Sequence, residues 1–162
     1  MIPPGVDRAD VLTVYYDASC PLCVTEMRTL QGYAGQARMR LVDCSAADFD
    51  DRDVRLAGFT RLELMACIHA QDSDGLWLRG VDVFERAYRI AGLASVARAC
   101  RNRWLRPLLD RAYPWIARNR MLLSRLHLEV AFAWLIGRLA RRAQRLSQSC
   151  KVDGCNLPAR PS

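Results

Sequence analysis

Residues 11–34 constrain the fold more than any other part of this 162-residue chain. Positions 11–16 read VLTVYY, a nearly continuous β-branched and aromatic run that is typical of a strand covered on both faces in a parallel sheet. Pro21 suits the first position of a following helix, where its missing N–H costs nothing. From Cys23 onward, apolar residues recur every three or four positions, which predicts an amphipathic helix. A second strand is predicted at 39–42, so the chain begins as a β-α-β unit.

Turn and cap residues divide the chain as far as Gly92 into further short elements. The turn sequence Asp72-Ser73-Asp74-Gly75 separates two apolar runs and predicts a β-hairpin. The predicted elements are a helix over 45–57 that begins at Ser45, a strand over 64–70, a returning strand over 76–78 and a helix over 83–91. Together with the first unit they give an α/β fold in the order β-α-β-α-β-β-α.

The rest of the chain is predicted to be helical as far as a loose tail. Pro107 and Pro114 are expected to start or break helices. In the last helix, over 128–139, apolar residues lie on one face and arginines on the other. Such a helix packs on a core or lies at a membrane interface, and core packing is the favoured interpretation. The predicted domains are a first domain over 1–92, a basic helical extension packed on it over 93–146, and a flexible tail over 147–162.

Charge is divided unevenly along the chain, whose net charge is +7. Residues 1–90 carry a net charge of −4, and residues 91–162 carry a net charge of +11. The basic half fits an anionic membrane, an acidic protein or nucleic acid, although solvated arginine-rich helix faces are the favoured interpretation. We expect no nucleic-acid partner, because the chain has no helix-turn-helix, zinc-finger or RNA-binding signature. A weak contact of the basic helices with anionic membranes is left open.

Hydropathy and tryptophan placement bear on where the protein acts. No stretch has the ~18 to 20 uncharged apolar residues that a membrane-spanning helix needs, and the first residues lack the pattern of a secretion signal. A cytoplasmic location is therefore expected. Trp104, Trp115 and Trp134 lie among arginines and raise the alternative of a membrane- or protein-docking adaptor. Tryptophans at helical spacing are more often part of a core, which is the favoured interpretation.

The seven cysteines are an odd number, which in a reducing compartment does not indicate a disulfide scaffold. Three of them lie among apolar residues and are predicted to be small buried hydrophobic groups: Cys44, Cys67 and Cys100. The other four form two close pairs, Cys20 with Cys23 and Cys150 with Cys155. The two histidines, His69 and His127, are isolated, and we expect both to be structural.

The pair of Cys20 and Cys23 is placed where thiol chemistry needs it. Spacing alone is a weak signal in a chain with seven cysteines, but this pair falls between a buried strand and the first turn of a helix. Free amide N–H groups and the positive end of the helix dipole stabilise a thiolate there. We predict that Cys20 is the exposed attacking sulfur, and that Cys23, one turn deeper, is the resolving thiol that closes the disulfide.

Asp17 precedes Cys20 by three residues, at the end of the first strand. One interpretation makes its carboxylate the proton acceptor for Cys23 in the second half of the exchange. The other makes it a turn carboxylate that accepts hydrogen bonds from the amides of Ala18 and Ser19. The residues themselves leave both interpretations open.

Three separated stretches resemble one known family. Residues 15–23, YYDASCPLC, resemble the signature of the DCC family of thiol-disulfide oxidoreductases, named for its Asp, Cys and Cys. Residues 74–84 resemble the family's central hairpin and helix, and residues 113–120, YPWIARNR, resemble its late helical motif. The resemblance implies a thioredoxin-like domain, with redox roles for both cysteines of the signature and with Asp17 as its third residue.

The chain departs from the pattern of this family at two points. Ala18 stands where the family has Gly, and no proline occurs between Pro21 and Pro107, where thioredoxins carry a cis-proline. The second departure argues against thioredoxin-style binding of an extended protein chain. We expect a thiol-disulfide oxidoreductase without cofactor or metal, which acts on a protein or small-molecule disulfide or thiol. Its electron donor is not identified by the sequence.

Two alternatives give the cysteines other roles. Cys150 and Cys155 could complete a four-thiolate zinc site with Cys20 and Cys23, because ligand spacings of about two to four residues suit zinc. The tail pair could instead relay electrons to Cys23 as a flexible dithiol. An incidental pair in a loose tail is favoured over both.

Overall fold

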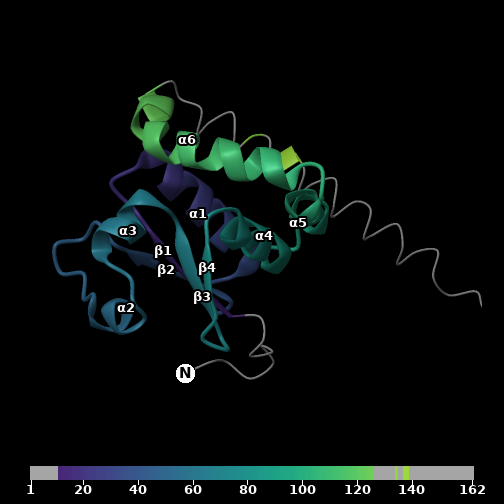
Figure 1. Cartoon of the computed structure of the whole chain (residues 1–162). Helices are drawn as coiled ribbons and strands as arrows, with labels where there is room; N and C mark the ends of the chain where they lie inside the picture. The colour runs from purple at the N-terminus through teal and green to yellow at the C-terminus, as the bar shows by residue number, and fades with distance from the viewer. Residues whose placement is uncertain (1–10, 126–133, 135–136, 139–162) are drawn as a thin grey trace, which may run out of the picture.

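The computed structural model describes residues 11–125, 134 and 137–138. Among them, a four-stranded sheet in the order β2-β1-β3-β4 is packed against helices (Figure 1). The strands are β1 (Leu12–Tyr16), β2 (Met39–Asp43), β3 (His69–Asp72) and β4 (Trp77–Arg79). The helices are α1 (Pro21–Ala34), α2 (Arg52–Leu56), α3 (Arg61–Ala66), α4 (Val81–Ile90), α5 (Ala94–Arg101) and α6 (Arg106–Arg125).

The β1 strand lies inside the sheet, as the β-α-β prediction requires. It pairs in parallel with β2, to which the crossover helix α1 connects it, and it pairs antiparallel with β3. The β3 and β4 strands form an antiparallel hairpin. The hairpin turn is the predicted one: Gly75 has φ +84°, and Asp72 Oδ1 accepts hydrogen bonds from the amides of Asp74 and Leu76. This mixed sheet with its helices confirms the predicted α/β class and is consistent with a thioredoxin-like fold.

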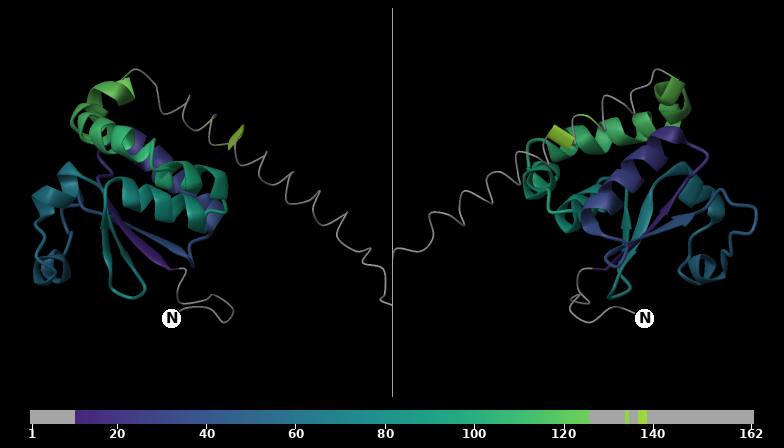
Figure 2. Two further views of the ribbon diagram at one scale, coloured as in Figure 1. Left: turned by 45° about the vertical axis from the view of Figure 1, so that its right-hand side comes forward. Right: turned by 180° about the vertical axis from the view of Figure 1, so that it is seen from behind.

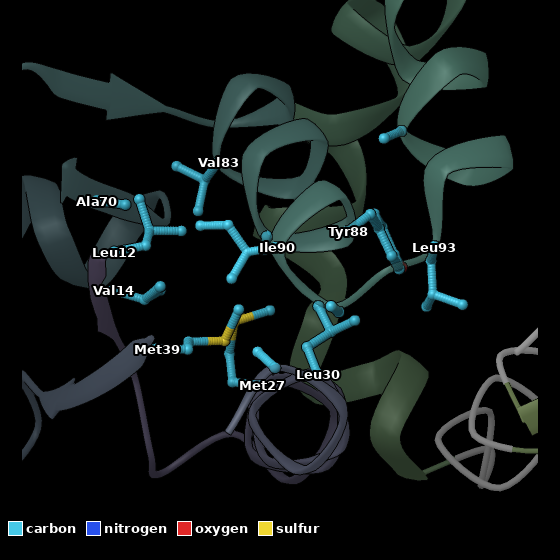
Figure 3. Packing of buried hydrophobic residues seen from close by; sticks show 14 of the residues in the cluster. Leu12, Val14, Met27, Leu30, Met39, Ala70, Val83, Tyr88, Ile90 and Leu93 are labelled. Carbon is cyan, nitrogen blue, oxygen red and sulfur yellow. The ribbon is translucent and has the colours of Figure 1, made fainter. Parts of the chain in front are cut away.

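The main core lies between the sheet and helices α1 and α4 (Figure 3). Side chains alternate along β1, so that Leu12 and Val14 point into this core, where Met27 and Leu30 of α1 also lie. The predicted apolar stripe of the first helix is the face that packs here. On the opposite face of β1, Tyr15 packs against a smaller cluster that includes buried residues of α2 and α3. Both faces of β1 are thus covered, as its apolar run predicts.

The helix predicted over 45–57 is wrong over most of its length, because α2 spans only Arg52–Leu56. Ser45 does not cap a helix. Its N–H and its hydroxyl both donate to Asp43 Oδ1, at 2.8 and 2.6 Å. These bonds hold the residues after β2 in a turn, so the helix begins later.

The strand predicted over 64–70 is wrong in its first half, because Arg61–Ala66 forms α3 and β3 begins only at His69. Thr60 and Glu63 make a capping box at the start of α3. The Thr60 side chain accepts from the Glu63 amide, and the Glu63 carboxylate accepts from the Thr60 amide. This cap starts a helix inside an apolar run that is also typical of a strand.

Helix α6 contacts α1, α4 and α5 and runs across them (Figure 2). Pro107 lies in its first turn, as predicted for a helix start, whereas Pro114 lies inside the helix without ending it. In the described part of the chain, no helix is both long and apolar enough to cross a membrane. The last helix and the tail of the prediction fall almost entirely outside the described residues, and the division into three domains stays a prediction.

The prediction that the tryptophans belong to a core is wrong. Trp104, Trp115 and Trp134 are 78%, 57% and 59% exposed. The side of α6 that packs against the main core carries Leu109 and Tyr113. The Arg103 guanidinium lies over the Trp104 ring, 4.7 Å from its centroid.

Candidate active site

The loop between β1 and α1 carries the three predicted site residues. β1 ends at Tyr16, and Cys20 is the N-cap of α1, with φ −97° and ψ 110°. Pro21 takes the start of the helix, and the Cys20 carbonyl accepts a helical hydrogen bond from the Val24 amide at 3.0 Å. Cys20 therefore lies at the end of the helix where amide N–H groups have no helical partner.

Cys20 lies in surroundings that favour a thiolate. Its pKa is lowered to about 6, first by a hydrogen bond from the Cys23 thiol, against the opposing effect of burial. The amides of Cys23 and Leu22 and the charge of Arg120 lower it further. At a pKa of this size, about nine-tenths of the groups are ionised at neutral pH. The direction is the one expected for a cysteine at a helix start.

Cys23 keeps the proton of the pair. Its pKa is raised far above the usual value, first by its hydrogen bond to Cys20 and then by burial and by the charge of Cys20. The two sulfurs therefore hold one proton between them at neutral pH, with Cys23 as the donor and Cys20 as the acceptor. A dithiol in this state contains the thiolate that exchange requires.

The exposure predicted for the two sulfurs is wrong. Cys20 is fully buried, whereas Cys23 is half-buried and lines a pocket. Arg120 of α6 donates to Asp17 Oδ2 in the loop before Cys20. This contact joins a distant helix to a loop that the local sequence pattern leaves open. Cys23 is the sulfur that a molecule in the pocket can reach.

Both carboxylate oxygens of Asp17 are already occupied, and its side chain is 4% exposed. Oδ1 accepts from the Ser19 amide at 2.9 Å and from the Ser19 hydroxyl at 2.5 Å, while Oδ2 accepts from Arg120 at 2.5 Å. The Ala18 amide donates instead to Asp43 Oδ1, at 3.1 Å. The geometry favours the turn-carboxylate interpretation over a proton acceptor, with Ser19 and Arg120 as the partners.

Glu26 belongs to the site although the sequence analysis does not single it out. It lies one helical turn after Cys23 and lines the same pocket, and its Oε1 accepts from the Tyr88 hydroxyl at 3.1 Å. Burial raises the pKa of Glu26 to about 7, the Tyr88 hydrogen bond opposes this shift, and the charge of Cys20 adds to it. A carboxyl group close to the thiols on the first helix is the signal that identifies it.

Arg120 is the second site residue that the sequence analysis does not single out. It lies 103 positions after Asp17 in the sequence, yet it pairs with that carboxylate and also lowers the pKa of Cys20. Its signal in the sequence is its place as the last residue of the stretch 113–120, which resembles a family motif.

The other predicted residues have structural surroundings. Cys44 and Cys100 are buried, as predicted, whereas Cys67 is half-buried. His69 is buried in β3 with its Nδ1 2.8 Å from the Cys67 carbonyl oxygen, which fits a structural role. Within residues 11–125, 134 and 137–138, no group of three or more His, Cys, Asp or Glu side chains could hold a metal ion. Three predicted residues lie outside that part: His127, Cys150 and Cys155.

A mixed α/β fold with a dithiol at the start of its first helix is typical of thioredoxin-like thiol-disulfide proteins. The model of the DCC1-like thiol-disulfide oxidoreductase family matches residues 14–126, and the chain belongs to this family. An uncharacterized chloroplastic protein of Arabidopsis thaliana is 31% identical over 111 residues, which is 68% of this chain and 51% of that protein. The chain thus spans about half the length of this curated relative. No solved structure matches.

Proposed function

We propose that this chain is a dithiol–disulfide oxidoreductase that transfers electrons through Cys20 and Cys23. Membership of the family supports a general thiol-disulfide oxidoreductase role. The observation that carries the specific proposal is the shared proton: a Cys20 thiolate with a pKa of about 6 accepts a hydrogen bond from a protonated Cys23. Such a pair matches the reduced form of a redox-active dithiol, and the exchange needs no cofactor.

The exchange takes two steps. One sulfur of the pair attacks a substrate disulfide, forms a mixed disulfide and releases the first thiol. The other sulfur then attacks the mixed disulfide, closes the disulfide between Cys20 and Cys23, and releases the second thiol. Two electrons pass to the substrate, and a dithiol donor returns them to the protein. The direction in the cell depends on the reduction potential of the pair against that of its compartment, for which we propose the cytoplasm.

Asp17 has a positioning role in this proposal. Its carboxylate holds the loop through Ser19 and holds Arg120 close to the Cys20 thiolate. No proton transfer to Asp17 is required, because the thiolate that the substrate releases in the first step takes up the proton of the remaining thiol.

Single substitutions test the proposed function with dithiothreitol as the electron donor and a small disulfide as the substrate. Cys20→Ser and Cys23→Ser should each lower the turnover by about 100-fold or more, because each step needs one of the sulfurs. Cys44→Ser is the matched control, since Cys44 is a buried thiol in the smaller cluster and should leave turnover within about twofold. Full activity in both site variants would overturn the proposal.

The exposed tryptophans favour a second candidate function, a weak contact with anionic membranes. Trp104 is 78% exposed and carries the Arg103 guanidinium over its ring, so an apolar ring and a positive charge face water together. Co-sedimentation with phosphatidylserine vesicles should be present at low salt and lost at high salt, and Trp104→Ala should weaken it. Absence of binding at low salt would remove this candidate.

A further inference from the structure

Three large apolar side chains of α6 form an exposed row, which we call the apolar stripe. Leu108, Trp115 and Leu122 are 62%, 57% and 59% exposed. They follow one another at intervals of seven residues, about two helical turns, so they lie on nearly the same side of the helix over about 21 Å. This side differs from the one that packs against the core with Leu109 and Tyr113. A contiguous apolar row marks an interaction site, whereas single exposed apolar side chains do not.

Arginines border the apolar stripe. Arg111 and Arg118 are both exposed and are also seven residues apart. Helical geometry places each of them within about 80° of every residue of the stripe around the helix axis. Asp110 is the one acidic residue in the sequence of α6, and it forms an ion pair with Arg106. The same side of the helix therefore presents apolar side chains and positive charge together.

The residues just before α6 add groups of the same two kinds. Trp104 is 78% exposed, and the Arg103 guanidinium lies over its ring. Arg98 and Arg101 of α5 are exposed and precede this pair in the chain. Tryptophan and arginine suit the interface of a bilayer, because the ring occupies the boundary of the apolar region while the guanidinium stays among the headgroups.

Charge and shape distinguish the partners that such a face fits. A second copy of the chain would bring the arginines of two α6 helices together, and like charges repel. An acidic protein would attract the arginines but would also need an apolar groove that matches the stripe. A bilayer needs no matching groove, since its acyl chains adapt to the apolar side chains while anionic headgroups attract the arginines. An anionic bilayer is therefore the partner that fits best.

We propose that α6 lies in the plane of an anionic phospholipid bilayer, with the apolar stripe inserted below the headgroups and the neighbouring arginines among them. The inference rests on the second candidate function, the weak contact with anionic membranes. It deepens that function, because it names the docking surface, the chemistry of the lipid and the orientation of the helix.

This orientation brings the surroundings of the dithiol to the lipid surface. A pocket of about 680 Å³ lies beside Cys23 and is lined in part from α6. Trp115 belongs both to this lining and to the apolar stripe, and Ile116 of the lining is 39% exposed. The docked protein therefore turns one wall of the pocket towards the bilayer.

Co-sedimentation of the full chain with vesicles tests the lipid chemistry. Vesicles of mixed phosphatidylserine and phosphatidylcholine should bind the chain about tenfold more tightly than vesicles of phosphatidylcholine alone at low salt, because the arginines gain anionic partners. High salt should abolish this difference. Equal binding to both kinds of vesicle would overturn the proposal.

Substitutions in the apolar stripe test the docking surface. The double variant Leu108→Ala/Leu122→Ala should weaken binding to the anionic vesicles by about tenfold or more, and Leu122→Ala alone by about threefold. Met121→Ala is the matched control, because Met121 is 50% exposed but points to another side of α6, about 100° from Leu122. It should leave binding within about twofold. Circular dichroism checks that each variant folds, and unchanged binding in a folded double variant would overturn the proposal.

A second pair of variants separates this surface from the net charge of the protein. Arg111→Gln/Arg118→Gln should weaken binding to the anionic vesicles by about tenfold or more. Arg52→Gln/Arg55→Gln removes the same charge from α2, which lies far from α6 (Figures 1 and 2), and should leave binding within about twofold. Equal losses in the two double variants would show that net charge alone drives binding, and would overturn the proposed surface.

The remaining outcomes assign the face or the contact elsewhere. A dimer in sedimentation velocity that Leu108→Ala/Leu122→Ala dissociates, without binding to vesicles, would overturn the proposal in favour of a second copy of the chain. Vesicle binding that survives this variant but is lost in Trp104→Ala would overturn the surface and leave the second candidate function intact. Absence of binding at low salt would overturn both. The dithiol–disulfide function is tested separately, since it depends on Cys20 and Cys23.

Discussion

Arg120 Nη2 lies 2.5 Å from Asp17 Oδ2, although 103 positions separate the two residues in the sequence. Their side chains are only 18% and 4% exposed, so the ion pair is largely shielded from water. Arg120 also lowers the pKa of Cys20, and Asp17 holds the loop through Ser19. One contact thus connects α6 both to the stability of the loop and to the ionisation of the thiol.

Replacement of Arg120 should therefore change stability and thiol ionisation together. Arg120→Met leaves the Asp17 carboxylate buried without its cation, and we expect the free energy of unfolding to fall by about 2 to 4 kcal/mol. The pKa of Cys20 should rise, because one of the charges that lower it is removed. Urea unfolding measures the first effect, and the ultraviolet absorbance of the thiolate measures the second.

Arg118→Met is the matched control for this ion pair, because Arg118 is an exposed arginine on the same helix. It should change the free energy of unfolding by less than about 0.5 kcal/mol and leave the pKa of Cys20 where it was. Equal effects of the two substitutions would contradict the role assigned to Arg120.

The ionisation of Cys20 should depend mainly on Cys23, whose thiol hydrogen bond is the largest cause of the lowered pKa. In the reduced protein, the thiolate absorbance should rise with a midpoint near pH 6, and Cys20→Ser should remove this transition. Cys23→Ala removes the hydrogen bond and should raise the midpoint by about one pH unit or more. A midpoint near that of a free cysteine in the unsubstituted protein would contradict the assigned thiolate.

Elements decided by adjacent residues could be predicted from the sequence. The apolar run of β1 and Pro21 at the start of α1 act locally, and the β-α-β unit follows from them. The wrong predictions arise where a side chain has a second possible partner. Ser45 could cap a helix but bonds to Asp43 instead, and the capping box of Thr60 starts a helix where the apolar run also fits a strand.

The same distinction applies to the site. The place of Cys20 and Cys23 at a helix start is a local property, so the sequence predicts it. The burial of Cys20 is a tertiary property, and no local pattern shows that Arg120 of α6 reaches Asp17. Glu26 lies between these two cases, because its spacing from Cys23 is visible in the sequence, whereas its place in the pocket lining and its hydrogen bond from Tyr88 of α4 are tertiary properties.

Glu26 should make stability depend on pH, since burial raises its pKa from 4.5 to about 7. Between these values the folded protein binds a proton that the unfolded chain has released, so the free energy of unfolding falls as the pH rises. Glu26→Gln removes this ionisation and keeps an oxygen for Tyr88. By urea unfolding, the variant should exceed the unsubstituted protein by about 1 to 3 kcal/mol near pH 8 and match it near pH 4.5.

Glu63→Gln gives a control of opposite sign. Hydrogen bonds from the amide and the hydroxyl of Thr60 lower the pKa of Glu63, so its charged form stabilises the fold. Near pH 8, Glu26→Gln should be more stable than the unsubstituted protein. At the same pH, Glu63→Gln should be less stable than the unsubstituted protein. If the stability difference of Glu26→Gln is the same at both pH values, the buried ionisation assigned to Glu26 is wrong.

Tyr113 links α6 to the segment before β3, because its hydroxyl oxygen accepts a hydrogen bond from the Ile68 amide at 2.9 Å. Tyr113→Phe keeps the ring and leaves this partly buried amide without its acceptor, so we expect the free energy of unfolding to fall by about 1 to 2 kcal/mol. Tyr33→Phe is the matched control, since Tyr33 is 38% exposed and should change stability by less than about 0.5 kcal/mol. Equal unfolding midpoints in urea for the two variants would show that water replaces the Tyr113 hydroxyl without loss, and that this hydrogen bond does not stabilise the position of α6.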